Sequence, residues 1–419
     1  MKKIFISAGL AAIAVGFPSV HAQSMDAAPS KLWNVSATLR GFYDDNYTAT
    51  STKRDSFGFE VAPSVSANMD MRQTDIGVRY TFGLYYYQDR ANQAGKSGGP
   101  IDYTHQADVW LDHAFTESLK ANVSDSLVVA QDPKLMDGGA TIRVQGNNLA
   151  NRANVMLTKD WTREFSTETF YGNNYIHYSS GSPSSVGGVS YDALLSRIEQ
   201  NVGTDFSWLF EQETTGFIGY KFSWVNYTAD KNIGGGFRSD SRNQRSHYVY
   251  VGATHKFSPN LSATAKGGMT LVDLYNDPTA SKNSTAPYAD LSATWTFMPG
   301  SYVLAGFRQD TRSTDAAYHD GATQLTQYQE MSQFYMNLSH QFDAKLTGSL
   351  TAQYAYSKFK DGYYGNHADN EVDAGANLSY QITRNFSADV GYNFTDLLSD
   401  FGSREYSRNR VYIGVGASY

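Results

Sequence analysis

The residues of this chain that could do chemistry are its histidines and the charged side chains within its strand-like stretches. His105 and His113 share the alternating position of Val109 and Leu111, so we expect them to face the apolar side. Catalysis at a histidine needs a hydroxyl, thiol or carboxylate within hydrogen-bond reach. No histidine here has such a partner at a recognisable spacing. The sequence therefore predicts that the protein is not an enzyme.

Metal and cofactor sites are not predicted either. The absence of cysteine excludes thiolate zinc sites, disulfide scaffolds and a lipoprotein-type anchor. Acidic loop segments such as Asp44-Asp45-Asn46 contain calcium-type ligands but not the ordered spacing of a calcium-binding loop. We expect such segments to be solvated loops, with no cofactor and no metal.

A second group of charges alternates with apolar residues along the chain. If the apolar face of each strand meets lipid, these charges line a water-filled lumen, where they can select solutes. They can equally pair with one another and solvate the lumen. Their mixed signs predict weak ion selectivity and a preference for polar neutral or sugar-like solutes. The predicted lining residues are Arg40, Glu60, Arg79, Asp108, Asp112, Arg152, Arg197, Glu199, Lys221, Lys266, Asp290, Arg308, Asp373, Asp389, Arg408 and Arg410.

The elements that must position these charges are β-strands. Stretches of strict alternation recur along the chain, and helical periodicity of similar quality occurs nowhere after the first residues. We count eighteen strands, with sixteen as the alternative. They are expected at residues 33–43, 57–69, 73–87, 103–115, 120–130, 149–159, 163–175, 194–208, 213–228, 243–257, 260–274, 286–297, 300–311, 328–342, 345–357, 370–382, 385–396 and 406–419.

The connections alternate between short turns, such as Ser258-Pro259, and long polar loops, such as 131–148 and 176–193. This alternation is typical of a transmembrane up-and-down antiparallel β-barrel with short periplasmic turns and long extracellular loops. A propeller with blades of about forty residues is the alternative. Blades need four strands, however, and only two fit each repeat.

Aromatic residues mark the ends of the descending strands. At the level of the short turns they would form the girdle found at membrane interfaces. The final stretch, 412–419, has apolar residues at every second position and resembles the signal by which the barrel-assembly machinery recognises its clients. The predicted interface aromatics are Phe115, Trp161, Trp208, Phe257, Phe297, Phe342, Tyr380 and Tyr419.

The N-terminal residues predict export. Lys2 and Lys3 precede an apolar stretch that ends at Val20-His21-Ala22, which is the pattern of a signal peptide cleaved after Ala22. A short buried helix is the alternative. Cleavage changes the net charge from −7 to −9, which argues against a nucleic-acid partner. We expect a signal peptide at 1–22, a short periplasmic segment at 23–32 and a single barrel domain at 33–419.

Several motifs resemble a known family. They include Gly41-Phe42-Tyr43-Asp44-Asp45-Asn46, the segment 59–64, and Tyr85-Tyr86-Tyr87 within 80–89. The segments 101–113 and 123–133 extend the resemblance over residues 38–135. Together they resemble the putative β-barrel porin 2 family. The resemblance implies an outer-membrane barrel, in some members associated with exopolysaccharide secretion.

The sequence thus favours a porin-like channel for polar solutes in the outer membrane of a Gram-negative bacterium, or a port for exopolysaccharide export. The expected partners are outer-membrane lipid and lipopolysaccharide, the barrel-assembly machinery and components of polysaccharide export. The alternative is a structural or adhesive surface barrel whose long loops bind a partner. The pattern leaves open whether a long loop folds inward.

Overall fold

The computed structural model describes residues 32–91, 99–179, 188–277, 279, 283–402 and 404–419. These residues form one sheet of eighteen long strands. The strands are β1 (Trp33–Asp44), β2 (Ser56–Asp70), β3 (Thr74–Tyr87), β4 (Ile101–Thr116), β5 (Leu119–Ala130), β6 (Asn148–Asp160), β7 (Phe165–His177), β8 (Arg197–Glu211), β9 (Thr214–Tyr227), β12 (Gln244–Ser258), β13 (Leu261–Asp273), β14 (Asn283–Met298), β15 (Ser301–Arg312), β16 (Tyr328–Gln341), β17 (Leu346–Lys360), β18 (Ala368–Gln381), β19 (Phe386–Ser399) and β20 (Tyr406–Ser418). The expected signal peptide at 1–22, and residues 23–31 after it, lie outside the described residues.

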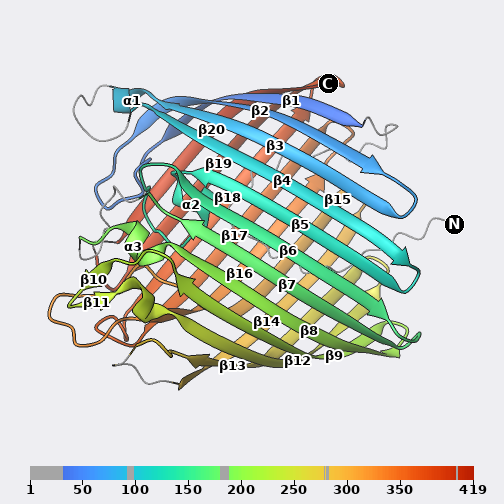
Figure 1. The fold of residues 1–419 in the computed structure, drawn as a ribbon. Coiled ribbons are helices and arrows are strands. Elements are labelled where there is room, and N and C mark those ends of the chain that lie inside the picture. The colour runs from blue at the N-terminus through green and yellow to red at the C-terminus, as the bar shows by residue number, and fades with distance from the viewer. Residues whose placement is uncertain (1–31, 92–98, 180–187, 278, 280–282, 403) are drawn as a thin grey trace.

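The sheet closes into a barrel. Each long strand pairs antiparallel with the next one in the chain, and β9 pairs with β12. The last strand, β20, then pairs antiparallel with β1, from Ser36 opposite Ser418 to Asp44 opposite Arg410. Figure 1 shows the tilted strands wrapping into a closed wall. The prediction of an eighteen-stranded up-and-down barrel is therefore confirmed, and every strand end lies within three residues of its expected place.

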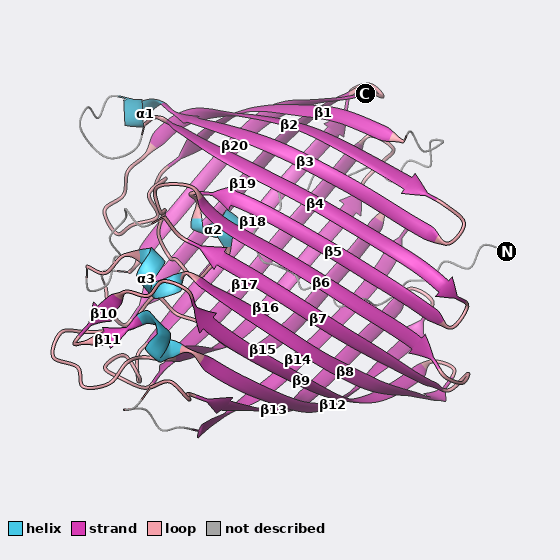
Figure 2. Ribbon diagram, in the orientation of Figure 1, coloured by secondary structure: helices cyan, strands magenta, loops and turns pink. Residues whose placement is uncertain are grey.

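Short and long connections lie at opposite ends of this barrel. Figure 2 shows the tight turns at one end and the long loops at the other. The long loops carry short elements that the sequence did not predict: α1 (Gln88–Ala91), α2 (Pro133–Met136), α3 (Tyr191–Leu195), β10 (Asn232–Gly234), β11 (Phe237–Arg238) and the 3₁₀ turn η1 (Ser239–Arg242). Among the described residues, no helix has the length and apolar character that a membrane-crossing helix needs.

The wall has two chemically different faces. In β20, Val411, Ile413 and Val415 are exposed on the outside, whereas Arg408 and Arg410 alternate with them on the inside. Successive side chains of a strand point to opposite faces, so this alternation gives an apolar exterior and a charged interior. The charged side chains of this strand therefore face the interior of the barrel, and its apolar side chains face outward.

Two prolines interrupt the hydrogen-bond ladder of the wall. Pairing between β2 and β3 stops at Val61 opposite Leu84 and resumes at Ser64, which skips Pro63. Pairing between β14 and β15 ends at Ala289 opposite Gln309, two residues from Pro287. Proline has no backbone N–H to donate, so the ladder opens beside it.

Candidate functional site: the barrel interior and its inward loop

The sixteen charges that the sequence placed in the lumen lie on the inward side of their strands, where most of them pair. The cluster on β1, β2, β19 and β20 shows the pattern. Arg40 donates from Nε to Asp389 at 2.8 Å and lies 3.6 Å from Glu60. Glu60 also accepts from Arg410 at 3.3 Å. Each charge thus has an opposite charge one or two strands away around the wall.

Aromatic rings cover the same cluster. The guanidinium of Arg40 lies 4.8 Å from the ring centre of Tyr412, and that of Arg410 lies 4.2 Å from the ring of Phe42. A cation over an aromatic face gains further attraction when both are withdrawn from water. This part of the wall is therefore held by ion pairs and rings together.

A second inward cluster lies on the strands from β8 to β15. Lys266 donates to Asp205 at 3.1 Å, and Tyr250 donates to the same carboxylate at 2.5 Å. The Lys221 ammonium lies 3.6 Å from the ring centre of Tyr248. Seven more of the predicted charges contact one another or a polar neighbour: Arg79 with Asp108 at 2.8 Å, Arg308 with Asp290 at 3.3 Å, Arg197 with Glu199 at 2.6 Å, and Asp112 with Asn122 at 2.5 Å.

The loop between β5 and β6, residues 131–147, folds into the barrel, and we call it the inward loop. It contains α2, whose first turn is set by its sequence. The side chain of Asp132 accepts from the Lys134 N–H at 2.9 Å, and Pro133 occupies the first helical position. Both are favourable starts for a helix. Asp137 ends the helix in a left-handed conformation with φ of 45°.

Salt bridges fix the start of the inward loop to strands far from β5. Lys134 pairs with Glu371 and, at 3.0 Å, with Asp373, both on β18. Asp132 pairs with Arg408 of β20 at 2.8 Å. β18 is seven strands away from β5 around the wall. A short segment can reach it only through the interior, so the inward loop crosses the lumen.

The rest of the inward loop is held by other parts of the wall. Arg143 donates from Nε to Asp102 of β4 at 3.1 Å. Arg152 of β6 donates to the Met136 carbonyl at 2.6 Å, and Arg197 of β8 donates to the Gly138 carbonyl at 3.0 Å. Two of the predicted lumen charges, Arg152 and Arg197, thus bind the end of α2.

The charge on Asp132 is stabilised where the loop meets the wall. Burial by itself would raise the pKa of this carboxyl. The Arg408 guanidinium and the Lys134 N–H outweigh the burial, and the pKa is lowered from its ordinary value. Asp132 therefore stays ionised in the folded loop, which its ion pair requires.

The long loops share an apolar core at the mouth of the barrel. Met136 and Val144 of the inward loop pack with Tyr191, Leu194 and Leu195 of α3 and with residues of the loops after β9 and β15. Arg242 lies in the same layer and donates to the carbonyls of Leu194 at 2.8 Å and Thr314 at 2.5 Å. The described loops thus cover one another at this end of the barrel.

The expectation of a solvated loop at residues 44–46 is wrong. Asp44 and Asn46 are 0% exposed. Arg408 donates to Asp44 at 2.6 Å, and Asn46 donates from its side chain to the carbonyls of Thr50 and Ser407. An acidic segment looks solvated in the sequence because its partner lies more than 360 residues away. Among the described residues, no group of three potential metal ligands is found.

Three of the outward histidines share one structural role. His113 contacts the Thr74 hydroxyl through Nδ1 at 2.8 Å, and His255 contacts Thr214 in the same way at 2.9 Å. His340 repeats the contact with Ser301 at 3.0 Å. Each of these histidines also meets the phenylalanine two residues later edge to face, with ring centres 4.5 Å apart. This arrangement occurs three times near the short turns, which indicates that the histidine contacts hold the strand ends in place.

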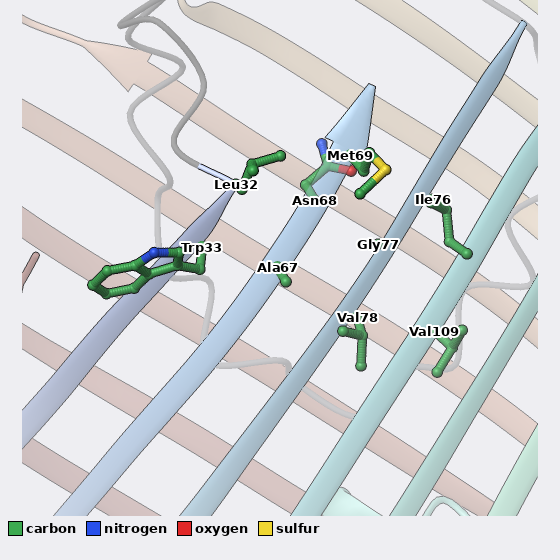
Figure 3. Close-up of a pocket in the computed structure, with 9 residues that line it drawn as sticks. All are labelled: Leu32, Trp33, Ala67, Asn68, Met69, Ile76, Gly77, Val78 and Val109. Carbon is green, nitrogen blue, oxygen red and sulfur yellow. The ribbon is translucent and has the colours of Figure 1, made fainter. Parts of the chain in front are cut away.

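The predicted interface aromatics lie at the short-turn end, on the outward side. Phe115, Trp161 and Trp208 are among those with more than half of the side chain exposed, whereas Phe297 is half-buried. Near them, an apolar groove of about 430 Å³ lies on the outer surface of β1 to β4. Figure 3 shows that its lining includes Trp33, Ile76 and Val109, which are outward residues. The groove is therefore separate from the charged interior.

A closed antiparallel barrel with an apolar exterior and a charged, loop-crossed interior defines a porin-like protein. In agreement, residues 239–419 match the model of the family described as "Putative beta-barrel porin 2". The match covers η1 and the strands from β12 to β20. The family is the one expected from residues 38–135, although the matched residues lie in the other part of the chain.

Solved structures from Pseudomonas aeruginosa and Acinetobacter baumannii resemble the chain at low identity. OpdK of Pseudomonas aeruginosa, solved with vanillate, is 11% identical, with 92% of this chain and 99% of that one covered and a TM-score of 0.46. OccAB4 of Acinetobacter baumannii is 13% identical, covers 94% and 100%, and has a TM-score of 0.43. OccK2 (OpdF) of Pseudomonas aeruginosa, solved with glucuronate, is 12% identical, covers 92% and 98%, and has a TM-score of 0.45. No curated protein matches the chain.

Proposed function

We propose that the chain is an outer-membrane channel for small polar solutes, and that the inward loop sets the width of its lumen. The observation that carries this proposal is the set of anchors from β4, β6, β8, β18 and β20 on one short segment. A segment fixed to the wall on several sides narrows the space through which solutes pass. The charges around the loop are paired, so the lumen surface is polar but has little net charge.

Export and membrane insertion belong to the same proposal. The N-terminal signal sends the chain to the periplasm, and β20 with its alternating apolar face is the segment that the assembly machinery would recognise. The barrel then spans the outer membrane of a Gram-negative bacterium, with the long loops outside. The apolar exterior supports this placement, because a charged side chain at the lipid-facing midplane costs about 2–4 kcal/mol.

Two other functions follow less well from the geometry. An exopolysaccharide port needs a passage for a polymer, and the anchored inward loop supports a narrower one. A surface adhesin needs loop side chains that face outward, whereas residues of loops 131–148 and 176–193, such as Val144 and Tyr191, are buried against each other. Both observations support a channel for small solutes.

Swelling of proteoliposomes tests the proposal. Vesicles containing the purified mature protein should swell in neutral monosaccharides and disaccharides, with a cut-off in sugar size that a long oligosaccharide exceeds. Swelling without any cut-off would favour a polymer port. A lack of swelling in every sugar, together with a lack of conductance in planar bilayers, would contradict the channel.

A further inference from the structure

On the outward face, the neighbouring strands from β5 to β8 carry a row of polar side chains. Asp125 of β5 lies directly opposite Val109 of β4, a residue that is 44% exposed on the outside. The next residue, Ser126, points inward and donates to Asp108. The carboxylate of Asp125 is therefore on the outward face, where it accepts from the Asn151 amide at 2.8 Å.

The depth of Asp125 follows from β4. Tyr103 and Phe115 are exposed near the two ends of this strand, and Val109 lies midway, six residues from each. For a strand that rises about 3.3 Å per residue and tilts by about 40°, each end is roughly 15 Å from this level. Asp125, opposite Val109, thus lies near the middle of the apolar band.

Register extends the polar row sideways from Asp125. Asp125 lies opposite Ala153 of β6, which lies opposite Asn173 of β7, which in turn lies opposite Gln200 of β8. Gln200 donates to the Tyr171 hydroxyl at 2.8 Å. We call Asp125, Asn151, Asn173 and Gln200 the polar row.

Other strands have apolar side chains at a comparable level. Val249 and Val251 of β12, Val390 of β19 and Ile413 of β20 are exposed outward residues near the middle of their strands. The amides of the row lie nearer the long loops, with Asn151 and Gln200 three residues from the loop ends of β6 and β8. The Asp125 carboxylate is deeper, where a charged group facing hydrocarbon is unfavourable and polar groups normally face protein or water. The polar row should therefore be covered by protein in the membrane.

We infer that the polar row is the contact between two copies of this chain, an inference that rests on the proposed membrane location. The row contains a carboxylate, which accepts hydrogen bonds, and amides, which donate them. The row of one copy can therefore bind the row of a second copy. Every copy inserts with the same orientation and presents its row at the same depth. The apolar outward faces of strands such as β12, β19 and β20 offer no such partner at this level.

Cross-linking tests this inference on the full-length protein. The chain has no cysteine, so a single Ala153→Cys substitution places one thiol in the centre of the row. Ala352→Cys is the matched control, because Ala352 is an exposed outward alanine on β17. We expect bis-maleimidoethane to convert Ala153→Cys in outer membranes into a species of twice the chain mass, several-fold more than the control.

A second variant tests the carboxylate itself. Asp125→Leu in the Ala153→Cys background should reduce the cross-linked fraction, whereas the conductance of each channel stays unchanged because the residue faces away from the lumen. Equal cross-linking of Ala153→Cys and Ala352→Cys would overturn the inference, as would adducts at masses that are not multiples of the chain. A failure of conductance in every variant would instead contradict the proposed function.

Discussion

Lys134 offers a direct way to release the inward loop from the barrel wall. Its ammonium joins α2 to Glu371 and Asp373 on β18, and Asp373 is only 1% exposed. Lys134→Met keeps the length and apolar stem of the side chain and removes the charge. We expect the loop to leave the wall more often, because the anchor to β18 is lost.

The size of this effect can be worked out from the contacts. A hydrogen bond to a charged group contributes about 1.5–3 kcal/mol, and both partners of Lys134 are less than one-third exposed. Asp373 keeps its bond from the Thr395 hydroxyl at 2.8 Å, so it is not left without a partner. A loss of about 2 kcal/mol corresponds to a roughly 30-fold rise in the ratio of released to anchored loop.

Single-channel recording in planar bilayers measures this ratio as the fraction of time spent at the higher conductance level. Lys53→Met is the control, because Lys53 pairs with Asp45 in another long loop and is 47% exposed. Exposed pairs of this kind contribute about 0–1 kcal/mol. Equal gating of the two variants would refute the reasoning that Lys134 anchors the loop.

Three further predictions concern packing, pH and the loop layer. Gly77→Ala should lower the free energy of unfolding in urea by about 1–3 kcal/mol, because the added Cβ would overlap the Trp110 ring. Gly267→Ala is the control: nothing lies near its added Cβ, so the free energy of unfolding should stay unchanged. The pKa of Asp132 is lowered in the folded loop, so its ion pair stabilises the loop fully above the ordinary pKa of about 3.9 and is lost only as the pH falls through the lowered value. Loop gating should therefore stay constant from about pH 7 to 5. A rise in gating within that window would contradict the lowered pKa. Arg404→Gln leaves the buried carboxylates of Asp315 and Asp369 without their cation, so the packing of the long loops should lose about 3–5 kcal/mol. Protease should then cut these loops faster, whereas unchanged cleavage would show that the pairing is dispensable.

The wall could be predicted from the sequence because its signal is local. A strand with two different faces repeats every second residue, as in 386–396, and each short turn follows directly in the chain. The same alternation placed Arg40, Asp373 and Arg408 on the inward side. Strand number and strand ends therefore followed from the residue pattern alone.

The inward loop could not be predicted in this way. Its anchors join Asp132 to Arg408 and Lys134 to Asp373, at separations of more than 230 residues. No local pattern distinguishes these charges from those of a solvated loop, although Asp132-Pro133 does have the form of a helix start. The apolar core that the long loops share could not be predicted either, because its residues come from four connections that are far apart in the sequence.

Removal of the inward loop tests the central claim most directly. The Val144 N–H donates to the Gln131 carbonyl at 3.1 Å, so residues 132–143 can be replaced by the two-residue turn Asn-Gly. Three wall residues that lose a partner in the loop keep another: Arg408 keeps Asp44, Asp102 keeps Arg90, and Asp373 keeps Thr395. We predict that the shortened protein still forms a heat-modifiable barrel and that its single-channel conductance is clearly higher than that of the full chain. An unchanged conductance from a folded, shortened barrel would contradict the claim that this loop sets the width of the lumen.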